Sequence, residues 1–281
     1  MSKTPFAKLY AEKIASLNDQ FCFFLLMREE LNQELKGLSP AAGKLYSKDV
    51  FTKNSYARKI HVTIDTLPKF QNENETLTFG SYFSTSYEVT TGYIEDILSL
   101  LGKTNSSTFV LKKGKSPEEI LSKSLLASGC TTTATEIIET LSYCRLRRNH
   151  FTHLGQSLTP KFNSLITTTG ARLNTFWTGS LSQLDFTSTV VDKFKENETI
   201  DLIKLLRICI EELDAVISAS LDANGLSEYC TRLLFGSQKV RINSVVLDER
   251  IRKVKNYIRQ KFGVTVSGSQ VETYAKTIGI R

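Results

Sequence analysis

Apolar residues recur at three- and four-residue spacing along most of the chain, which is the period of a helix with one buried face. Only five prolines and fifteen glycines interrupt the 281 residues. From Pro5 to Lys36 the apolar stripe is broad, as is typical of a buried helix, and Gly37 is suited to end that helix. The pattern therefore predicts an all-α protein in which strands are minor.

The same periodicity predicts further helices along the rest of the chain. Ser116 and Pro117 form a favourable helix start, with a hydroxyl at the N-cap, proline in the first turn and the acidic Glu118 beside it to meet the helix dipole. We expect helices at 81–101, from 117 to near Gly129, from Thr133 or Thr135 to Gly155, and at 160–177, 201–221, 226–234, 248–262 and 269–277.

Residues 38–79 are the least regular part of the pattern. They contain Pro40, Pro68 and the polar stretch QNENET, which favour loops. Apolar and polar residues alternate from Ile60 to Ile64, which predicts a short strand. His61 within it is interpreted as a surface residue without a role.

Composition indicates an ordinary folded protein. Hydrophobic residues make up 41% and charged residues 23% of the chain, which are typical globular values. The five cysteines lack C-x-x-C spacing and are interpreted as reduced thiols. The longest strongly apolar run, Phe21 to Met27, is far shorter than the ~20 residues that span a bilayer. We expect a cytoplasmic protein without a membrane segment or signal peptide.

Positive charge is concentrated near the carboxyl end. The formal net charge is +7 and the sequence pI is about 9.1, which favours a polyanionic partner. From Lys239 to Lys261 there are eight basic residues and two acidic ones. Gly236 and Ser237 resemble a hinge, so we expect one helical domain at 1–236 and a small basic helical appendage at 237–281.

Two of the three histidines fall in the seven-residue stretch RRNHFTH, residues 147–153. The stretch is predicted at the end of a helix, where Asn149 and His153 share a face. Arg148 lies about 140° from His153 around that helix, and its long side chain can still reach the same cleft. The stretch therefore offers a fixed cation, an orienting amide and an imidazole that exchanges protons near neutral pH.

These groups suit cleavage of RNA by its own 2′-hydroxyl. A base removes the 2′ proton, an acid protonates the leaving 5′ oxygen, and a cation stabilises the phosphoryl oxygens, so no metal or cofactor is required. The helix dipole favours a cation at the helix C-terminus, which suits His153 as acid or phosphate contact. One histidine cannot easily serve as both acid and base, so we expect a homodimer in which two copies divide the work.

The pattern Arg148-Asn149-x-x-x-His153 resembles the R-N-x-x-x-H signature of the HEPN superfamily, over residues 135–155. The resemblance implies an all-α, HEPN-type helical bundle with an additional N-terminal helix. It implies a metal-independent endoribonuclease whose composite site lies at a dimer interface, acting on RNA in toxin–antitoxin systems, abortive infection or antiviral defence, with an antitoxin or sensor protein as a further partner. By this resemblance Arg148 contacts the phosphate, Asn149 positions and His153 transfers the proton.

Further residues are auxiliary candidates. His150, Arg147 and Glu139 accompany the motif, Glu139 nine residues before Arg148. The basic helix at 248–262 supplies candidate RNA-binding residues, with Tyr257 as a stacking surface: Arg250, Arg252, Lys253, Lys255, Tyr257 and Arg259.

Other interpretations remain open. RRNHFTH could be a solvated basic helix end, because the helix dipole favours such residues there. Cys144, His150 and His153 could bind a metal, although the adjacent arginines would repel a cation. The basic helix could simply be a packed amphipathic helix with a solvated face. The alternative function is a non-catalytic helical module that binds nucleic acid or a partner protein.

Overall fold

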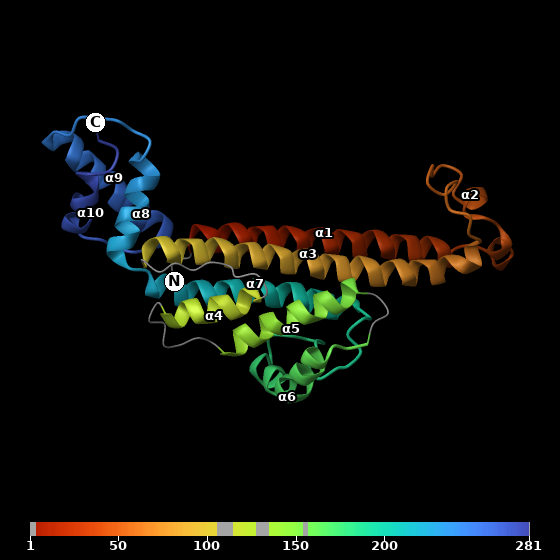
Figure 1. Cartoon of the computed structure of the whole chain (residues 1–281). Helices are drawn as coiled ribbons and strands as arrows, with labels where there is room; N and C mark the ends of the chain where they lie inside the picture. Colours follow the sequence, from red (N-terminus) through yellow and green to blue (C-terminus); the bar gives the residue numbers. More distant parts are fainter. Residues whose placement is uncertain (1–3, 106–114, 128–134, 154–156, 281) are drawn as a thin grey trace.

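The computed structural model describes residues 4–105, 115–127, 135–153 and 157–280 and shows ten α-helices there (Figure 1). Within these residues it contains no strand, which confirms the all-α class. The helices are α1 (Pro5–Lys36), α2 (Ser47–Val50), α3 (Leu67–Thr104), α4 (Pro117–Ala127), α5 (Thr135–Thr152), α6 (Pro160–Phe176), α7 (Glu196–Ser220), α8 (Ala223–Phe235), α9 (Ser244–Phe262) and α10 (Gly268–Ala275). Two short 3-10 turns, Pro40–Lys44 and Ile64–Thr66, precede α3.

Helices α1 and α3 form a long antiparallel pair that runs along most of the molecule (Figure 1). The pairing is fixed by aromatic contacts, with ring centroids 5.2 Å apart for Phe21 and Phe79 and 6.1 Å apart for Tyr10 and Tyr93. One end of the pair carries α2, and the other end meets α8, α9 and α10 (Figure 1). Residues on both helices therefore keep a defined register over many turns.

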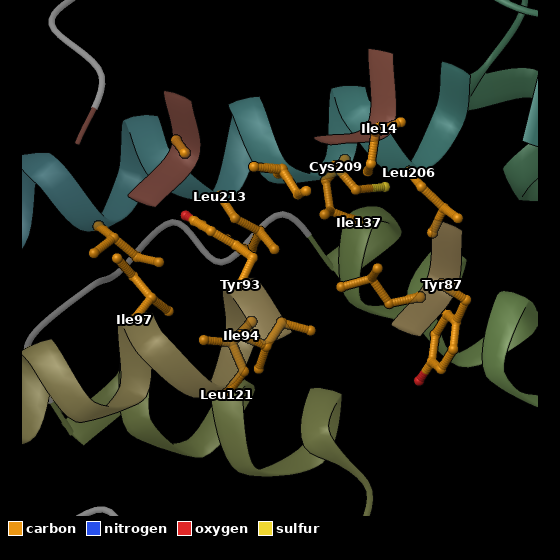
Figure 2. Close-up of a cluster of buried hydrophobic side chains, with 14 of the residues drawn as sticks. Ile14, Tyr87, Tyr93, Ile94, Ile97, Leu121, Ile137, Leu206, Cys209 and Leu213 are labelled. Carbon is orange, nitrogen blue, oxygen red and sulfur yellow. The ribbon is translucent and has the colours of Figure 1, made fainter. Parts of the chain in front are cut away.

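The main core lies where α1, α3, α4, α5 and α7 converge (Figure 2). Ile14, Tyr93, Leu121, Ile137 and Leu206 each come from a different one of these helices and point into the same cluster. Burial of such apolar surface contributes about 25 cal/mol per Å². The expected N-terminal helix is thus part of the central core.

A buried polar junction anchors the start of α1. The Thr4 hydroxyl accepts a hydrogen bond from the Ala7 amide at 3.2 Å, as an N-cap does. The Thr4 amide and hydroxyl in turn donate to the Asp214 carboxylate of α7 at 2.8 and 2.5 Å. Because an unpaired buried carboxylate is costly, these contacts tie the first turn of α1 to α7.

The prediction of a strand at Ile60–Ile64 is wrong. Only an isolated antiparallel bridge between Tyr46 and Thr63 forms there, with the Ser47 amide donating to the Val62 carbonyl at 3.0 Å. Alternation of apolar residues favours a strand only where a partner strand is present, and the described part of the chain supplies none.

The expected start of the second long helix is also wrong, because α3 begins at Leu67 and not near residue 81. Pro68 occupies the first turn of α3, where its missing N–H costs nothing. The polar stretch that favours a loop instead forms helical contacts, such as Gln71 Nε2 donating to Glu75 Oε1 at 3.0 Å. Glu75 also pairs with Arg28 of α1 at 3.4 Å, so packing against α1 extends the helix.

Other helix bounds differ by a few residues from the expected ones. Helix α3 continues past Gly102 to Thr104, α7 begins at Glu196, and α9 begins at Ser244. The N-cap of α9 is Asn243, whose side chain accepts a hydrogen bond from the Val246 amide at 2.9 Å. The expected helix limits at Gly129, Thr133 and Gly155 lie outside the described residues.

The C-terminal helices α8, α9 and α10 pack against one another and form a lobe at one end of the α1/α3 pair (Figure 1). Their shared interior is mostly apolar, and Val254, Ile258 and Val271 are fully buried in it. Helix α8 also packs against α3, so it connects this lobe to the central bundle. Within the described residues, no helix is both long and apolar enough to cross a lipid bilayer.

Candidate functional site

The stretch RRNHFTH lies at the C-terminal end of α5, as the sequence predicts, and its first six residues are helical. The backbone amide of His153 donates to the carbonyls of Asn149 at 3.1 Å and His150 at 3.2 Å, so His153 directly follows the last helical residue. Arg148, Asn149 and His153 are therefore brought together at one helix end, with His153 exposed to solvent.

The two adjacent arginines of the stretch point to different environments. Arg147 is fully buried, and its guanidinium donates to the Val191 carbonyl at 3.2 Å, the Tyr143 hydroxyl at 3.3 Å and Glu198 Oε1 at 2.8 Å. The guanidinium carbon also lies 4.7 Å from the ring centroid of Phe194. Arg147, an auxiliary candidate, is thus held inside the protein by α7 and the preceding loop.

Arg148 is the surface member of the pair, with 33% of its side chain exposed. One guanidinium nitrogen forms an ion pair with Glu88 of α3, and the other donates to Asn149 Oδ1 at 3.1 Å. Its Nε atom is buried without a hydrogen-bond partner. Arg148 and Asn149 are therefore already in direct contact, and Glu88 holds the cation from a neighbouring helix.

The other auxiliary candidates face away from this contact. The ring of His150 lies 6.4 Å from that of Phe162 on α6. Glu139 forms an ion pair with Arg172, which also pairs with Glu136 at 2.8 Å. Nine residues of helix separate Glu139 from Arg148, or about 13 Å along the axis. The structure therefore groups Arg148, Asn149 and His153 without Glu139.

Packing beneath the last turn of α5 fixes the position of the motif. The Phe151 ring lies 5.2 Å from that of Phe194, in an edge-to-face arrangement. The same ring rests against Gly80 of α3, where a Cβ atom would overlap it. Glycine at this position therefore permits the close approach of α5 to α3 that brings Arg148 to Glu88.

A second ion pair joins α5 to α4 one turn before the motif. Glu118 is 1% exposed, and its Oε1 accepts from Arg145 Nε at 2.6 Å and from the Ser142 hydroxyl at 3.1 Å. Burial, together with the nearby Glu118 charge, raises the pKa of Tyr87 on α3 above its usual value. The sequence assigns Glu118 only to the helix dipole, whereas in the structure it binds Arg145.

The groups considered for a metal site are divided between core and surface. Cys144 is fully buried, and burial raises the pKa of its thiol to about 12. His153, by contrast, is exposed at the helix end. In the described ranges, the structure groups no three His, Cys, Asp or Glu side chains that could hold a metal ion.

The candidate RNA-binding residues on α9 are also divided. Arg250 is buried, and its guanidinium donates to the carbonyls of Ala275, Ile278 and Gly279 at 3.4, 2.7 and 3.1 Å. Arg250 therefore holds the end of α10 and the residues after it against α9 inside the C-terminal lobe. Of the rest, Lys255 and Tyr257 are half-buried, and the exposed ones are Arg252, Lys253 and Arg259.

Glu88 is the residue of this site that sequence reasoning missed. It lies sixty residues before Arg148, on a different helix, and no local motif surrounds it. The one signal that could have identified Glu88 is its position on the solvent-facing side of α3. That position is known only once the packing of α3 against α5 is known. Comparisons with family models, curated proteins and solved structures gave no match.

Proposed function

We propose that this protein is a metal-independent endoribonuclease that cleaves RNA to a 2′,3′-cyclic phosphate. The observation that carries the proposal is the arrangement at the end of α5. There Arg148 and Asn149 are in contact at the surface, next to the exposed His153, while the adjacent Arg147 is buried. A simple solvated helix end does not need an arginine held by a neighbouring helix and an amide.

The proposed reaction uses only groups of this chain and of the RNA. A base takes the proton of the 2′-hydroxyl, whose oxygen then attacks the adjacent phosphorus. The bond from phosphorus to the 5′ oxygen breaks, and an acid gives that oxygen a proton. The products are a 2′,3′-cyclic phosphate and a 5′-hydroxyl. Arg148 stabilises the phosphoryl oxygens, and Asn149 orients Arg148.

His153 transfers protons in this scheme. Because each α5 end carries one exposed imidazole in the motif, the base and the acid come from two copies of the chain. The proposed active form is therefore a homodimer in which two α5 ends face a single phosphate. The proposed setting is antiviral defence, abortive infection or a toxin–antitoxin system, where an antitoxin or sensor protein would restrain the activity.

The experiment compares wild type, His153→Ala and His150→Ala on a fluorescent single-stranded RNA pool and on total tRNA. EDTA is present throughout, and product ends are identified by mass spectrometry. His150→Ala is the matched control, because His150 lies on the same helix end but faces Phe162. Circular dichroism checks that all three proteins fold.

We expect cyclic-phosphate ends from wild type and from His150→Ala. His153→Ala should lose about 10²- to 10⁴-fold in rate, the usual contribution of a general acid or base. Cleavage that survives in His153→Ala would rule out the proposed mechanism, and so would cleavage by wild type that occurs only when EDTA is left out.

The second candidate function is a non-catalytic helical module that binds nucleic acid or a partner protein. It is favoured by the exposed basic residues on α9, which are Arg252, Lys253 and Arg259. Folded wild-type protein that binds RNA and cleaves none would support this candidate.

A further inference from the structure

The net positive charge of the protein resides entirely in its C-terminal 45 residues. Residues 237–281 contain ten of the 36 basic residues and three of the 29 acidic ones. The preceding 236 residues contain 26 of each and are electrically balanced. The formal charge of +7 is therefore a local property of the lobe that contains α9 and α10.

Several basic residues of the lobe are already neutralised or buried. Arg250 is enclosed by backbone carbonyls, Lys253 pairs with Glu249 at 2.7 Å, and Lys276 pairs with Glu272 at 2.6 Å. Of the other seven basic residues, Arg281 lies outside the described residues. Among the described residues, the remaining six form no salt bridge: Lys239, Arg241, Arg252, Lys255, Arg259 and Lys261.

Three of these six form a ridge along α9. Arg252, Lys255 and Arg259 are spaced by three and four residues, so they share one helix face. They extend over about 10 Å, since each residue advances the helix by 1.5 Å. Successive phosphates of a stacked strand lie about 3.4 Å apart along the axis, so the ridge matches roughly three phosphates. A different face of α9 is buried through Val254 and Ile258.

The lobe meets the central bundle at the C-terminal end of α3. Gly225 of α8 lies so close to the carbonyl of Thr104, at the end of α3, that a Cβ atom would overlap it. Along α3, Thr104 is sixteen residues from Glu88, the partner of Arg148. That separation is about 24 Å of helix.

We propose that Arg252, Lys255 and Arg259 form a second RNA-binding surface, which holds backbone phosphates remote from the cleavage residues. The cleavage part of this inference rests on the proposed ribonuclease function. A stacked strand needs about seven nucleotides to cover the 24 Å from Glu88 to the end of α3 alone. The ridge is on α9, beyond that end of α3 (Figure 1), so only longer RNA reaches both surfaces. The preferred substrate is therefore an RNA that extends well beyond the scissile bond.

The chemistry of the ridge favours a nucleic-acid backbone over a protein. The exposed positions between Arg252 and Arg259 include the polar Lys253 and Asn256, and the half-buried Lys255 adds a further charge. Protein interfaces are depleted of lysine and have an apolar centre, which this stretch lacks. Phosphate groups need only positive charge at regular spacing.

The binding test uses His153→Ala protein, in which we expect cleavage to be too slow to interfere, and a 30-nucleotide 5′-fluorescein single-stranded RNA followed by anisotropy. The test variant carries Arg252→Gln, Lys255→Gln and Arg259→Gln. The control variant removes the same charge from the opposite end of the molecule, by Lys44→Gln, Lys53→Gln and Arg58→Gln. All three control side chains are exposed.

The ridge variant should bind at least about tenfold more weakly at low salt, and the slope of log affinity against log salt should fall by about two. The control variant should change neither quantity by a comparable amount. Equal losses in both variants would show a general charge effect and overturn the proposal. Undiminished binding by the ridge variant, or binding of polyglutamate as tight as that of RNA, would also overturn it.

A series of RNAs of increasing length then tests whether one RNA contacts both the cleavage residues and the ridge. For wild type, KM for cleavage should fall as the RNA grows from 6 to 30 nucleotides, about the range that spans both surfaces. The ridge variant should lose this length dependence, and a retained dependence would contradict the proposed reach. If no RNA is cleaved at all, the ribonuclease proposal fails, while the anisotropy result still decides whether the ridge binds RNA.

Discussion

Arg148 of α5 forms an ion pair with Glu88 of α3, and the same guanidinium donates to the Asn149 side chain. The pair joins two helices that are far apart in sequence, at the surface next to His153. A phosphate that binds Arg148 must therefore compete with the Glu88 carboxylate. Glu88 orients the arginine in the free protein and opposes the substrate at the same time.

We expect Glu88→Ala to bind RNA more tightly at low salt, because the phosphate no longer competes with a carboxylate. The stability of the fold should change by less than about 1 kcal/mol, since the pair is substantially exposed. RNA anisotropy in the His153→Ala background measures the first effect, and urea unfolding measures the second. Glu95→Ala is the control, because Glu95 is exposed on the same helix about two turns further on. Weaker RNA binding by Glu88→Ala would contradict the competition.

Substitution of Arg147 should lower mainly the stability of the fold, whereas substitution of the neighbouring Arg148 should lower mainly the rate of cleavage. Removal of Arg147 leaves Glu198 without its partner in the interior, which typically costs about 3–5 kcal/mol. Arg148→Ala should cost no more than about 1 kcal/mol, yet abolish most of the cleavage. Urea unfolding and RNA cleavage on both variants check the contrast. A stable, inactive Arg147→Ala protein would show that the roles of the two residues are reversed.

Gly80 offers a test of how packing positions the site. Gly80→Ala places a methyl group against the ring of Phe151, so the end of α5 must move away from α3. Overpacking of this kind costs about 1–3 kcal/mol, and the displaced Arg148 should lower cleavage as well. The double variant Gly80→Ala with Phe151→Leu has room for the methyl group and should recover part of both losses. Failure of the double variant to recover activity would argue against this coupling.

The sequence is informative where structure is determined locally. The prediction of a first helix from Pro5 to Lys36 is confirmed with those bounds, because Thr4 and Pro5 start it and Gly37 ends it. Likewise, the motif lies at the predicted helix end, since the apolar spacing before it is that of a helix.

The sequence is insufficient to predict features that depend on how the helices pack against one another. It does not reveal the start of α3, because contacts with α1 outweigh the loop preference of the polar stretch after Pro68. The separation of Arg147 from Arg148 escapes prediction as well, since both are arginines in the same helix and only the position of Glu198 makes one of them internal. Glu88 could not be found for the same reason.

The proposed homodimer makes a prediction that mixing experiments can check. Light scattering on wild-type protein should give twice the 31.6 kDa chain mass, or about 63 kDa. If the acid and the base are the His153 side chains of two copies, a mixed dimer with one His153→Ala chain lacks one of them.

Adding His153→Ala chains to wild type, after a step that exchanges subunits, should therefore lower activity with the square of the wild-type fraction. Lys53→Gln chains added in the same way serve as a control for the exchange step, because they keep both histidines and the ridge, and Lys53 is exposed at the opposite end of the molecule. A linear fall would mean that each chain cleaves RNA with its own His153, and the dimer would then have no part in proton transfer. The squared dependence requires that both imidazoles act on one phosphate, which is the chemical reason for proposing two copies.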